Sequence, residues 1–281
     1  MSKKNGKPAI PPDKRVVVIA DLHSGHLVGL TPRQYQHEYL DETETKHNKY
    51  IAVEKACWDY FETEIAKLKP VHILLVNGDC TDGRGEKSGG VELLTTSRIK
   101  QAEMATKAIL SCEPEYVVGT YGTDYHVASD GEDIEDIVYK DVADSLGAAA
   151  VKWGAHEWFR VHGVTFDAKH HVSFSGVPHT QYTAVARDAL WSGVWSLRRE
   201  APAAQVIIRS HVHAFAYCGN KEYLAMTTPA LQGMGSRYGA RRCSRTVDFG
   251  FVHFDVSHTG AYTWQPHLAD LPEQKPTVLH F

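Results

Sequence analysis

Apolar and polar residues follow one another along this chain in a pattern typical of a protein built from alternating strands and helices. Short runs rich in valine, isoleucine and leucine predict buried strands at residues 15–20, 71–76, 116–119 and 205–209. Apolar residues at helical spacing predict helices at residues 46–68, 91–110, 133–146 and 183–200. Because strands and helices alternate in the first half of the chain, we expect parallel strands joined by helical crossovers there.

The second half of the chain has a different pattern, in which strands follow one another closely. Residues 157–161 and 164–168 read as paired strands that turn at His162 and Gly163, and further strands are expected at 251–256 and 261–264. We therefore expect antiparallel strand pairs in addition to the parallel ones. This sequence of elements permits two architectures, which are helices on both faces of one mixed sheet and a two-sheet sandwich with helical flanks.

Composition narrows the class of protein. The chain has 281 residues, of which 43% are hydrophobic, and we expect one domain at residues 15–281 behind a flexible polar tail at residues 1–14. Its five cysteines are odd in number, scattered and never spaced as CxxC, so neither a disulfide framework nor a zinc ribbon is indicated. No signal peptide and no run of about 20 apolar residues is present, and together these features predict a cytoplasmic protein that does not enter a membrane.

The charge of the chain bears on its partners. A formal net charge of −4 gives no overall attraction to nucleic acid, so any polyanion must be bound by local groups. The sequence carries no indication of oligomeric state.

Three of the expected strands are followed directly by residues suited to binding metal ions. These residues are Asp21, His23, Asp79, His211 and His213. Members of each pair spaced two apart project to the same side of an extended segment. Carboxylates and imidazoles at strand ends are typical of a hydrolytic metal site, and two ions about 3.5–4 Å apart need a bridging carboxylate, for which Asp79 is the candidate.

In their order along the chain, these motifs resemble those of the calcineurin-like metallophosphoesterase superfamily. Its motifs are DxH, GDxxD, GNH with a following acidic residue, a later histidine and GHxH. Residues 21–23 read Asp-Leu-His, residues 78–82 read Gly-Asp-Cys-Thr-Asp, and residues 210–213 read Ser-His-Val-His with serine in place of glycine. The resemblance implies a four-layer α/β/β/α sandwich of mixed β-sheets flanked by helices.

The same resemblance implies a ligand set for two divalent ions. Asp21, His23 and His213 would hold the first ion, Asp79 would bridge, and His211 would hold the second ion together with an upstream histidine. That histidine is His170 or His171, and the sequence does not choose between them. Asp82 is placed to orient a ligand histidine. Such ligands accept manganese, iron, zinc or nickel, with manganese as our first expectation.

The third motif departs from the superfamily pattern, because residues 122–126 read Gly-Thr-Asp-Tyr-His and lack the usual asparagine. In one hypothesis Asp124 replaces the asparagine as an oxygen ligand and His126 is the general acid that protonates the leaving oxygen. In the other, His126 is a ligand, and Thr123 or Asp124 only supports the site. This GTxxH form, with the adjacent histidines 170–171, resembles a branch of the superfamily found among phage and prophage proteins.

Two further features bear on the substrate. His26 is a candidate contact for the substrate phosphate, although a plain loop role is equally open to it. Residues 235–245 hold four arginines, and Arg237, Arg241 and Arg242 are candidates for gripping phosphates, with a solvated loop as the alternative. These arginines favour nucleotides or nucleic-acid ends as the substrate class.

We therefore predict a metal-dependent phosphoesterase that hydrolyses phosphomonoesters or phosphodiesters. A water bridging two ions would become hydroxide at neutral pH and attack phosphorus in line, without a covalent enzyme intermediate. The alternative is a non-catalytic metal-containing module that recognises a phosphorylated or nucleic-acid partner, which the altered third motif would favour.

Overall fold

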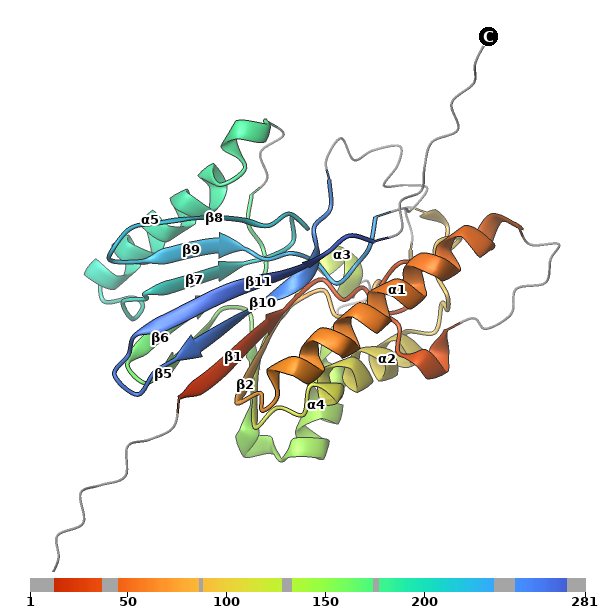
Figure 1. Ribbon diagram of the computed structural model, residues 1–281, viewed down its shortest axis with the longest axis horizontal. Coiled ribbons are helices and arrows are strands. Elements are labelled where there is room, and N and C mark those ends of the chain that lie inside the picture. The colour runs from red at the N-terminus through yellow and green to blue at the C-terminus, as the bar shows by residue number, and fades with distance from the viewer. Residues whose placement is uncertain are drawn as a thin grey trace, which may run out of the picture.

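Two β-sheets lie face to face in the computed structural model, and helices cover their outer faces (Figure 1). The structure describes residues 13–36, 45–85, 88–127, 133–173, 177–234 and 246–271. The expected tail at residues 1–14 therefore lies almost entirely outside the described residues, and the first strand begins at Lys14.

The first sheet has six strands in the order β11-β10-β1-β2-β3-β4. Their bounds are Tyr262–Ala269, Phe249–Val256, Lys14–Ile19, Ile73–Asn77, Tyr116–Thr120 and Val151–Gly154. Strands β1 to β4 are parallel, whereas β10 pairs antiparallel with both β1 and β11. The predicted parallel crossovers of the first half are thus confirmed.

The second sheet has five strands in the order β5-β6-β7-β9-β8. Their bounds are Glu157–Val161, Val164–Ala168, Val206–Arg209, Leu224–Thr227 and Ala216–Gly219. Strands β6, β7 and β9 are parallel, and β5 and β8 pair antiparallel at the two edges. His162 and Gly163 form the predicted turn between β5 and β6, and both have positive φ, as a two-residue hairpin loop requires.

Helices form the outer layers. The α-helices are α1 (Thr45–Leu68), α2 (Arg98–Ser111), α3 (Asp124–Val127), α4 (Glu135–Leu146) and α5 (Thr183–Leu197), and the short 3₁₀ helices are η1 (Arg33–Tyr35), η3 (Ala148–Ala150) and η4 (Pro178–Thr180). Helices α1, α2 and α4 cover the first sheet, and α5 covers the second (Figure 1). The protein is therefore a four-layer α/β/β/α sandwich, as the resemblance implied.

Alternating side chains on β1 show why both faces of the first sheet are apolar. Val16 and Val18 belong to the core between the two sheets, whereas Val17 and Ile19 belong to the core under α1 and α2. Side chains on a strand alternate between faces, so a strand buried on both sides needs an uninterrupted apolar run. This requirement explains the run of β-branched residues in the sequence.

The structure also corrects several expected elements. The helix expected at 91–110 begins only at Arg98, because Ser97 caps it by accepting a hydrogen bond from Lys100 N over 3.4 Å. Helix α5 ends at Leu197 rather than at residue 200. Strands β4, β8 and β9 were not predicted, since each has only four residues and no long apolar run.

Two further findings concern the cysteines and the possibility of a membrane-spanning helix. The four described cysteines, Cys57, Cys80, Cys112 and Cys218, are free thiols. Among the described helices, none is long and apolar enough to cross a membrane.

Candidate metal centre

The expected ligand residues lie at the carboxyl ends of strands from both sheets, and hydrogen bonds tie the loops that carry them to one another. Asp21 N donates to Gly78 O and His23 N to Asp79 O, each over 3.0 Å, so the loops after β1 and β2 remain paired. Beyond the second sheet, Ser210 N donates to His170 O over 2.8 Å. Loops at the carboxyl ends of parallel strands commonly form the binding site of an α/β protein.

The backbone at these positions is strained. Among the described residues, eight other than glycine have positive φ, and five of these are the predicted ligands Asp21, His23, Asp79, His211 and His213. A left-handed conformation of such residues costs on the order of 1–3 kcal/mol and persists only where the surroundings enforce it. Backbone strain concentrated at these five residues indicates a functional site.

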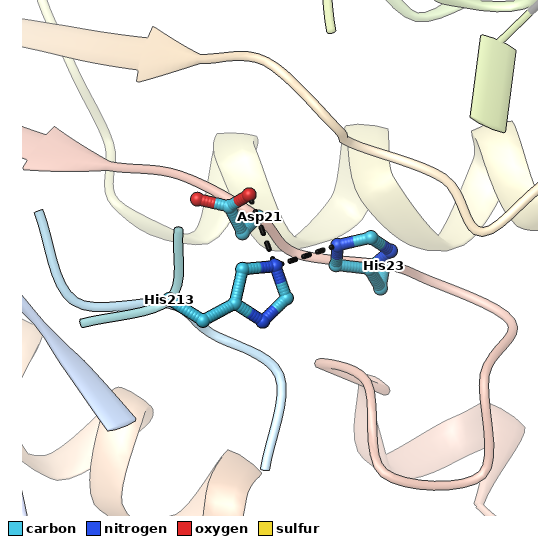
Figure 2. A group of neighbouring side chains, drawn as sticks. All are labelled: Asp21, His23 and His213. Atoms are coloured by element: carbon cyan, nitrogen blue, oxygen red, sulfur yellow. Dashed lines mark hydrogen bonds and ion pairs between the residues drawn. The ribbon is translucent and has the colours of Figure 1, made fainter. Parts of the chain in front are cut away.

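Three side chains form a first potential metal position. Asp21, His23 and His213 each offer one donor atom within 4.8 Å of the others (Figure 2). His213 Nε2 lies 3.2 Å from Asp21 Oδ1 and 3.2 Å from His23 Nε2. In Figure 2 the three side chains point toward one another from two separate loops.

A second potential position lies beside the first. Asp79, His170 and His211 form this group, and Asp79 also belongs to a third group with His23 and His126. Asp79 Oδ2 lies 3.0 Å from His170 Nε2 and 4.0 Å from His23 Nε2. This one carboxylate oxygen therefore lies within 4.0 Å of a histidine from each of the two groups.

Hydrogen bonds fix the orientation of two ligand histidines. His23 Nδ1 lies 3.0 Å from Asp82 Oδ1, and His170 Nδ1 lies 2.6 Å from the carbonyl oxygen of Asn77. A carbonyl oxygen only accepts, so His170 carries a proton on Nδ1, and Nε2 is the nitrogen left to bind a metal ion. A carboxylate places the His23 proton on Nδ1 in the same way. Such support is typical of metal-bound histidines.

The site concentrates titratable groups at short range. Burial alone lowers the pKa of His170, but the carboxylates of Asp79 and Asp21 raise it to about 10. Burial lowers the pKa of His211 to about 4, with a further contribution from His170. For Asp79, the neighbouring histidines outweigh burial and hold the pKa of the carboxyl well below its usual value. Without a cation, a proton on His170 offsets part of the negative charge of the two carboxylates.

The donor set fits divalent ions, and two buried atoms support that fit. The buried Asp21 Oδ1 lies 3.2 Å from His213 Nε2 and 3.9 Å from His170 Nε2, and the buried His170 Nε2 lies 3.0 Å from Asp79 Oδ2. Lone pairs that face one another at such distances are satisfied when a proton or a cation lies between them. Carboxylate oxygens and neutral imidazoles are suitable ligands for manganese, iron, zinc or nickel.

The residues of the third motif lie at different places relative to the potential metal positions. Thr123 donates to Asp79 Oδ1 through its backbone N–H over 2.7 Å and lies 3.1 Å from the same oxygen through Oγ1. Asp124 is exposed and belongs to none of the three groups. His126 lies with His23 and Asp79, and its Nδ1 is 3.1 Å from the carbonyl oxygen of Asp82. His126 therefore lies beside the predicted ligands, whereas Asp124 lies outside the three groups.

Other predicted site residues are placed as follows. His170 is buried and belongs to the second position. His171 is exposed and lies beside that position, with its ring centroid 4.8 Å from that of His211. His26 is buried, and its Nδ1 accepts a hydrogen bond from Val28 N within its own loop. Arg237, Arg241 and Arg242 lie outside the described residues.

Two polar residues that the sequence did not single out hold the ligand loops in place. Glu135 is buried at the start of α4 and accepts hydrogen bonds from Cys80 N over 2.6 Å and Gly122 N over 2.7 Å. The second residue is Asn77, whose carbonyl oxygen accepts a hydrogen bond from His170 Nδ1. In the sequence, only its position directly before the Gly-Asp of the second motif marks Asn77 as part of the site. No sequence pattern marks Glu135, because its partners lie in other loops.

Two glycines permit the close approach of the loops. A Cβ atom on Gly78, whose φ is +78°, would lie 2.5 Å from His170 Nδ1, and one on Gly122 would lie 2.1 Å from Asp79 Oδ1. Real Cβ atoms do not approach other atoms so closely. Any side chain at these positions would displace a predicted ligand.

Comparisons with known proteins show a similarity of fold. No protein-family model matches the sequence, and no curated protein matches it. Among solved structures, an archaeal phosphodiesterase shares 10% identity over 90% of this chain and 99% of that one, with a TM-score of 0.42. Zinc-bound Vps29 from Entamoeba histolytica shares 11% identity over 90% and 98% of the two chains, with a TM-score of 0.39. A predicted phosphoesterase from Streptococcus pneumoniae shares 8% over 92% and 99%, with a TM-score of 0.37.

Proposed function

We propose that this protein is a metal-dependent phosphoesterase of the metallophosphoesterase superfamily, with a dinuclear centre at the carboxyl ends of strands from both sheets. The observation that carries the proposal is the position of Asp79 Oδ2, 3.0 Å from His170 Nε2 and 4.0 Å from His23 Nε2. A shared carboxylate between two sets of nitrogen and oxygen donors is the feature that two-metal hydrolases require.

The roles of the side chains follow from their contacts. Asp21, His23 and His213 hold the first ion, His170 and His211 hold the second, and Asp79 serves both. Two divalent ions bound there supply Lewis acidity toward the phosphoryl oxygens and a nucleophile activated at neutral pH. Asp82 and the Asn77 carbonyl keep His23 and His170 in the tautomer that presents Nε2.

His126 completes the first position. Its Nδ1 is held at the carbonyl oxygen of Asp82, which leaves Nε2 as the nitrogen that faces His23 and Asp79. Its ring packs edge-on against His23 with a centroid distance of 4.6 Å. We assign it a donor role there, and Asp124, which is exposed, has no part in binding metal.

The substrate is a phosphomonoester or a phosphodiester. The arginines of residues 235–245 favour a nucleotide or a nucleic-acid end, since guanidinium groups bind phosphate oxygens in pairs. Manganese is the first metal to test, and iron, zinc and nickel follow, because a mixed set of carboxylates and imidazoles accepts all four. The GTxxH form of the third motif is consistent with the branch of the superfamily found among phage proteins.

The test is hydrolysis of bis(p-nitrophenyl) phosphate and p-nitrophenyl phosphate by metal-stripped protein that is titrated with Mn²⁺. We expect turnover that rises with Mn²⁺ and is lost in Asp79→Asn, while Asp144→Asn, which changes an exposed carboxylate on α4, remains active. The preferred ester separates a diesterase from a monoesterase. His126→Ala should raise the Mn²⁺ concentration needed for half-maximal rate if His126 is a ligand.

A non-catalytic binding module is the alternative function. Thr123 favours it, because this residue stands where the superfamily has a ligand asparagine and is instead bonded to Asp79. Tight uptake of metal without turnover of either ester, or of a nucleotide or DNA substrate, would support the binding module. Turnover that depends on Asp79 would exclude it.

A further inference from the structure

Helix α5 turns its large apolar side chains away from the protein. The helix lies on the outer face of the second sheet (Figure 1). Its buried residues are small or β-branched, and they are Ala184, Val185, Ala189 and Ser192. In contrast, Leu190, Trp191 and Leu197 are 68%, 51% and 87% exposed. A helix that covers a sheet in a monomer normally directs its large apolar residues inward, so the outer face of α5 has the composition of a surface that another molecule covers.

The exposed apolar residues of α5 are neighbours on one side of the helix, and we call them the α5 patch. They are Leu190, Trp191, Val194 and Leu197. No other described helix or strand carries more than one exposed large apolar residue. Two copies of the chain that associate through apolar surface of the described residues therefore use the α5 patch on both sides, which is the arrangement of a two-fold symmetric dimer.

Four residues on this face have the spacing that helix pairing requires. Arg187, Leu190, Val194 and Leu197 are all exposed and follow one another at intervals of three, four and three residues. Residues at such intervals line one side of a helix and interlock with a second helix. The intervals read the same from either end, so an antiparallel copy of α5 presents a matching row, with Leu190 opposite Val194 and Arg187 opposite Leu197.

The charges on α5 favour the antiparallel direction. In a parallel pair, the two Arg187 guanidinium groups would lie side by side and repel each other. In an antiparallel pair, each Arg187 lies beside Leu197 of the second copy, at the end of that helix where the dipole is negative. Its aliphatic stem covers the leucine while the guanidinium stays in water. Arg198, at the same end, is already paired with Glu200 over 2.7 Å.

The area of the α5 patch suits a weak dimer. Tryptophan buries about 150–250 Å² in full, so the half-exposed Trp191 contributes on the order of 100 Å². The three aliphatic side chains of the patch, which are 38% to 87% exposed, bring the total to several hundred Å² per copy. A standard interface buries about 800 Å² on each partner, of which a little over half is apolar. The patch therefore supplies the apolar centre of an interface at the small end of this range.

From these observations we propose that the protein forms a homodimer in which α5 packs antiparallel against α5 of a second copy. Leu190 and Val194 of the two copies form the centre of the interface, and Trp191 covers it from one side. The proposal does not depend on the proposed function, because no α5 residue belongs to the three donor groups of the metal centre.

The test is sedimentation equilibrium of the full chain over a series of concentrations. We expect a species of twice the chain mass that dissociates on dilution. Trp191→Ala should raise the dissociation constant by about 30-fold or more, the effect of truncating a tryptophan at the centre of an interface. Leu190→Glu should abolish the dimer, because it places a charge opposite Val194.

The matched control is Ile99→Glu on α2, which puts the same charge at an apolar position that is 54% exposed, on a helix that covers the other sheet. This variant should dimerise as the wild type does. Because Leu190 and Trp191 are themselves more than half exposed, their variants should keep the wild-type circular dichroism spectrum.

Cross-linking tests the direction of the two helices. A mixture of Arg187→Cys and Leu197→Cys proteins, treated with a short bismaleimide, should give a covalent dimer. Neither variant alone should do so, because its two new cysteines lie about 15 Å apart along the helix axis at about 1.5 Å per residue. Wild-type protein, in which Cys218 is a partly exposed free thiol, controls for reaction of the native cysteines.

Three results would overturn the proposal. A wild-type protein of monomer mass at every concentration would leave a different molecule as the occupant of the α5 patch. A dimer that Leu190→Glu leaves intact would have its interface elsewhere. Cross-linking within each single variant, without any in the mixture beyond that, would show parallel helices. A dimer that is lost in Leu190→Glu, kept in Ile99→Glu and cross-linked only in the mixture would support it.

Discussion

The Asn77 side chain donates a hydrogen bond to Ser210 Oγ over 2.6 Å and thereby joins the two sheets directly beneath the ligand loops. Asn77 ends β2 of the first sheet, and Ser210 follows β7 of the second. Thr120 Oγ1 donates to Asn77 Oδ1 over 2.8 Å, and Thr228 Oγ1 lies 2.7 Å from Ser210 Oγ, so the connection continues on both sides. Ser210 therefore has a hydrogen-bond partner in the first sheet.

Ser210→Ala should weaken this connection. The substitution leaves the buried Asn77 Nδ2 with only the 3.2 Å contact to Lys169 O, and loss of one buried partner costs about 1–3 kcal/mol in the free energy of unfolding. Urea denaturation of the metal-free protein measures this loss. Ser145→Ala, which removes an exposed hydroxyl that bonds within α4, should stay within about 0.5 kcal/mol of wild type. Equal stability of the two variants would contradict the prediction.

Gly122→Ala should damage the metal centre more than the fold. The new Cβ would lie 2.1 Å from Asp79 Oδ1 and 2.4 Å from Asp79 N, so either the Asp79 loop or the Gly122 loop must move. We expect a destabilisation of about 1–3 kcal/mol, the usual cost of overpacking, together with weaker Mn²⁺ binding in calorimetry.

The matched control is Gly193→Ala on α5, where a Cβ meets nothing within 4 Å. Alanine has the higher helix propensity, so this variant should gain about 0.5–1 kcal/mol in stability and bind Mn²⁺ as the wild type does. Unchanged Mn²⁺ binding in Gly122→Ala would show that the ligand loops tolerate the displacement.

Glu135→Gln should change how stability depends on pH. Burial, followed by the charge of Asp79, raises the pKa of Glu135 to about 8 from an ordinary value of 4.5. A carboxyl whose pKa is raised in the folded state is costly to ionise there, so its contribution weakens the metal-free protein as pH rises from about 4.5 to about 8. Glutamine cannot ionise, and this part of the decline should be absent in the variant.

The unfolding free energy at a series of pH values from 4.5 to 8 tests this prediction for Glu135. The variant should also lose about 1–3 kcal/mol at all pH values, because one amide oxygen must serve both Cys80 N and Gly122 N. Glu103→Gln, an exposed change on α2, should keep the wild-type slope. A wild-type slope in Glu135→Gln would argue against the raised pKa.

Asp167→Asn should remove part of the acid sensitivity of the fold. Although burial raises the pKa of Asp167, bonds from His156 and Ser192 and the charge of Arg209 lower it to about 2. Its contribution to stability is therefore present above the ordinary value of about 4 and is lost as pH falls toward about 2.

The variant should be less stable at neutral pH by about 3 kcal/mol or more, since the fully buried Arg209 guanidinium loses the negative charge that lies 2.8 Å from its Nη1. Between about pH 4 and pH 2 the difference from wild type should shrink. Denaturant unfolding over this range measures both effects. A difference that stays constant with pH would show that Asp167 titrates normally.

Local sequence patterns determined the strands that carry the site and the residue types at their ends. The apolar runs that became β1, β2, β3 and β7 were predicted because a strand buried on both faces needs such a run over its own length. The choice between one mixed sheet and two was not determined by these runs. It depends on which strands pair, and the short strands β8 and β9 have no pattern that marks them.

Only the tertiary structure decided which side chains meet. The sequence left His170 and His171 equivalent, but His170 Nδ1 lies 2.6 Å from Asn77 O, a contact that depends on the approach of a strand from the other sheet. The packing of α4 brought Glu135 to Cys80 and Gly122, and the turn at Gly122 placed Thr123 on Asp79 and left Asp124 exposed. The physical reason is that periodicity reports the face on which a side chain lies, whereas its partners across the fold depend on how the loops pack together.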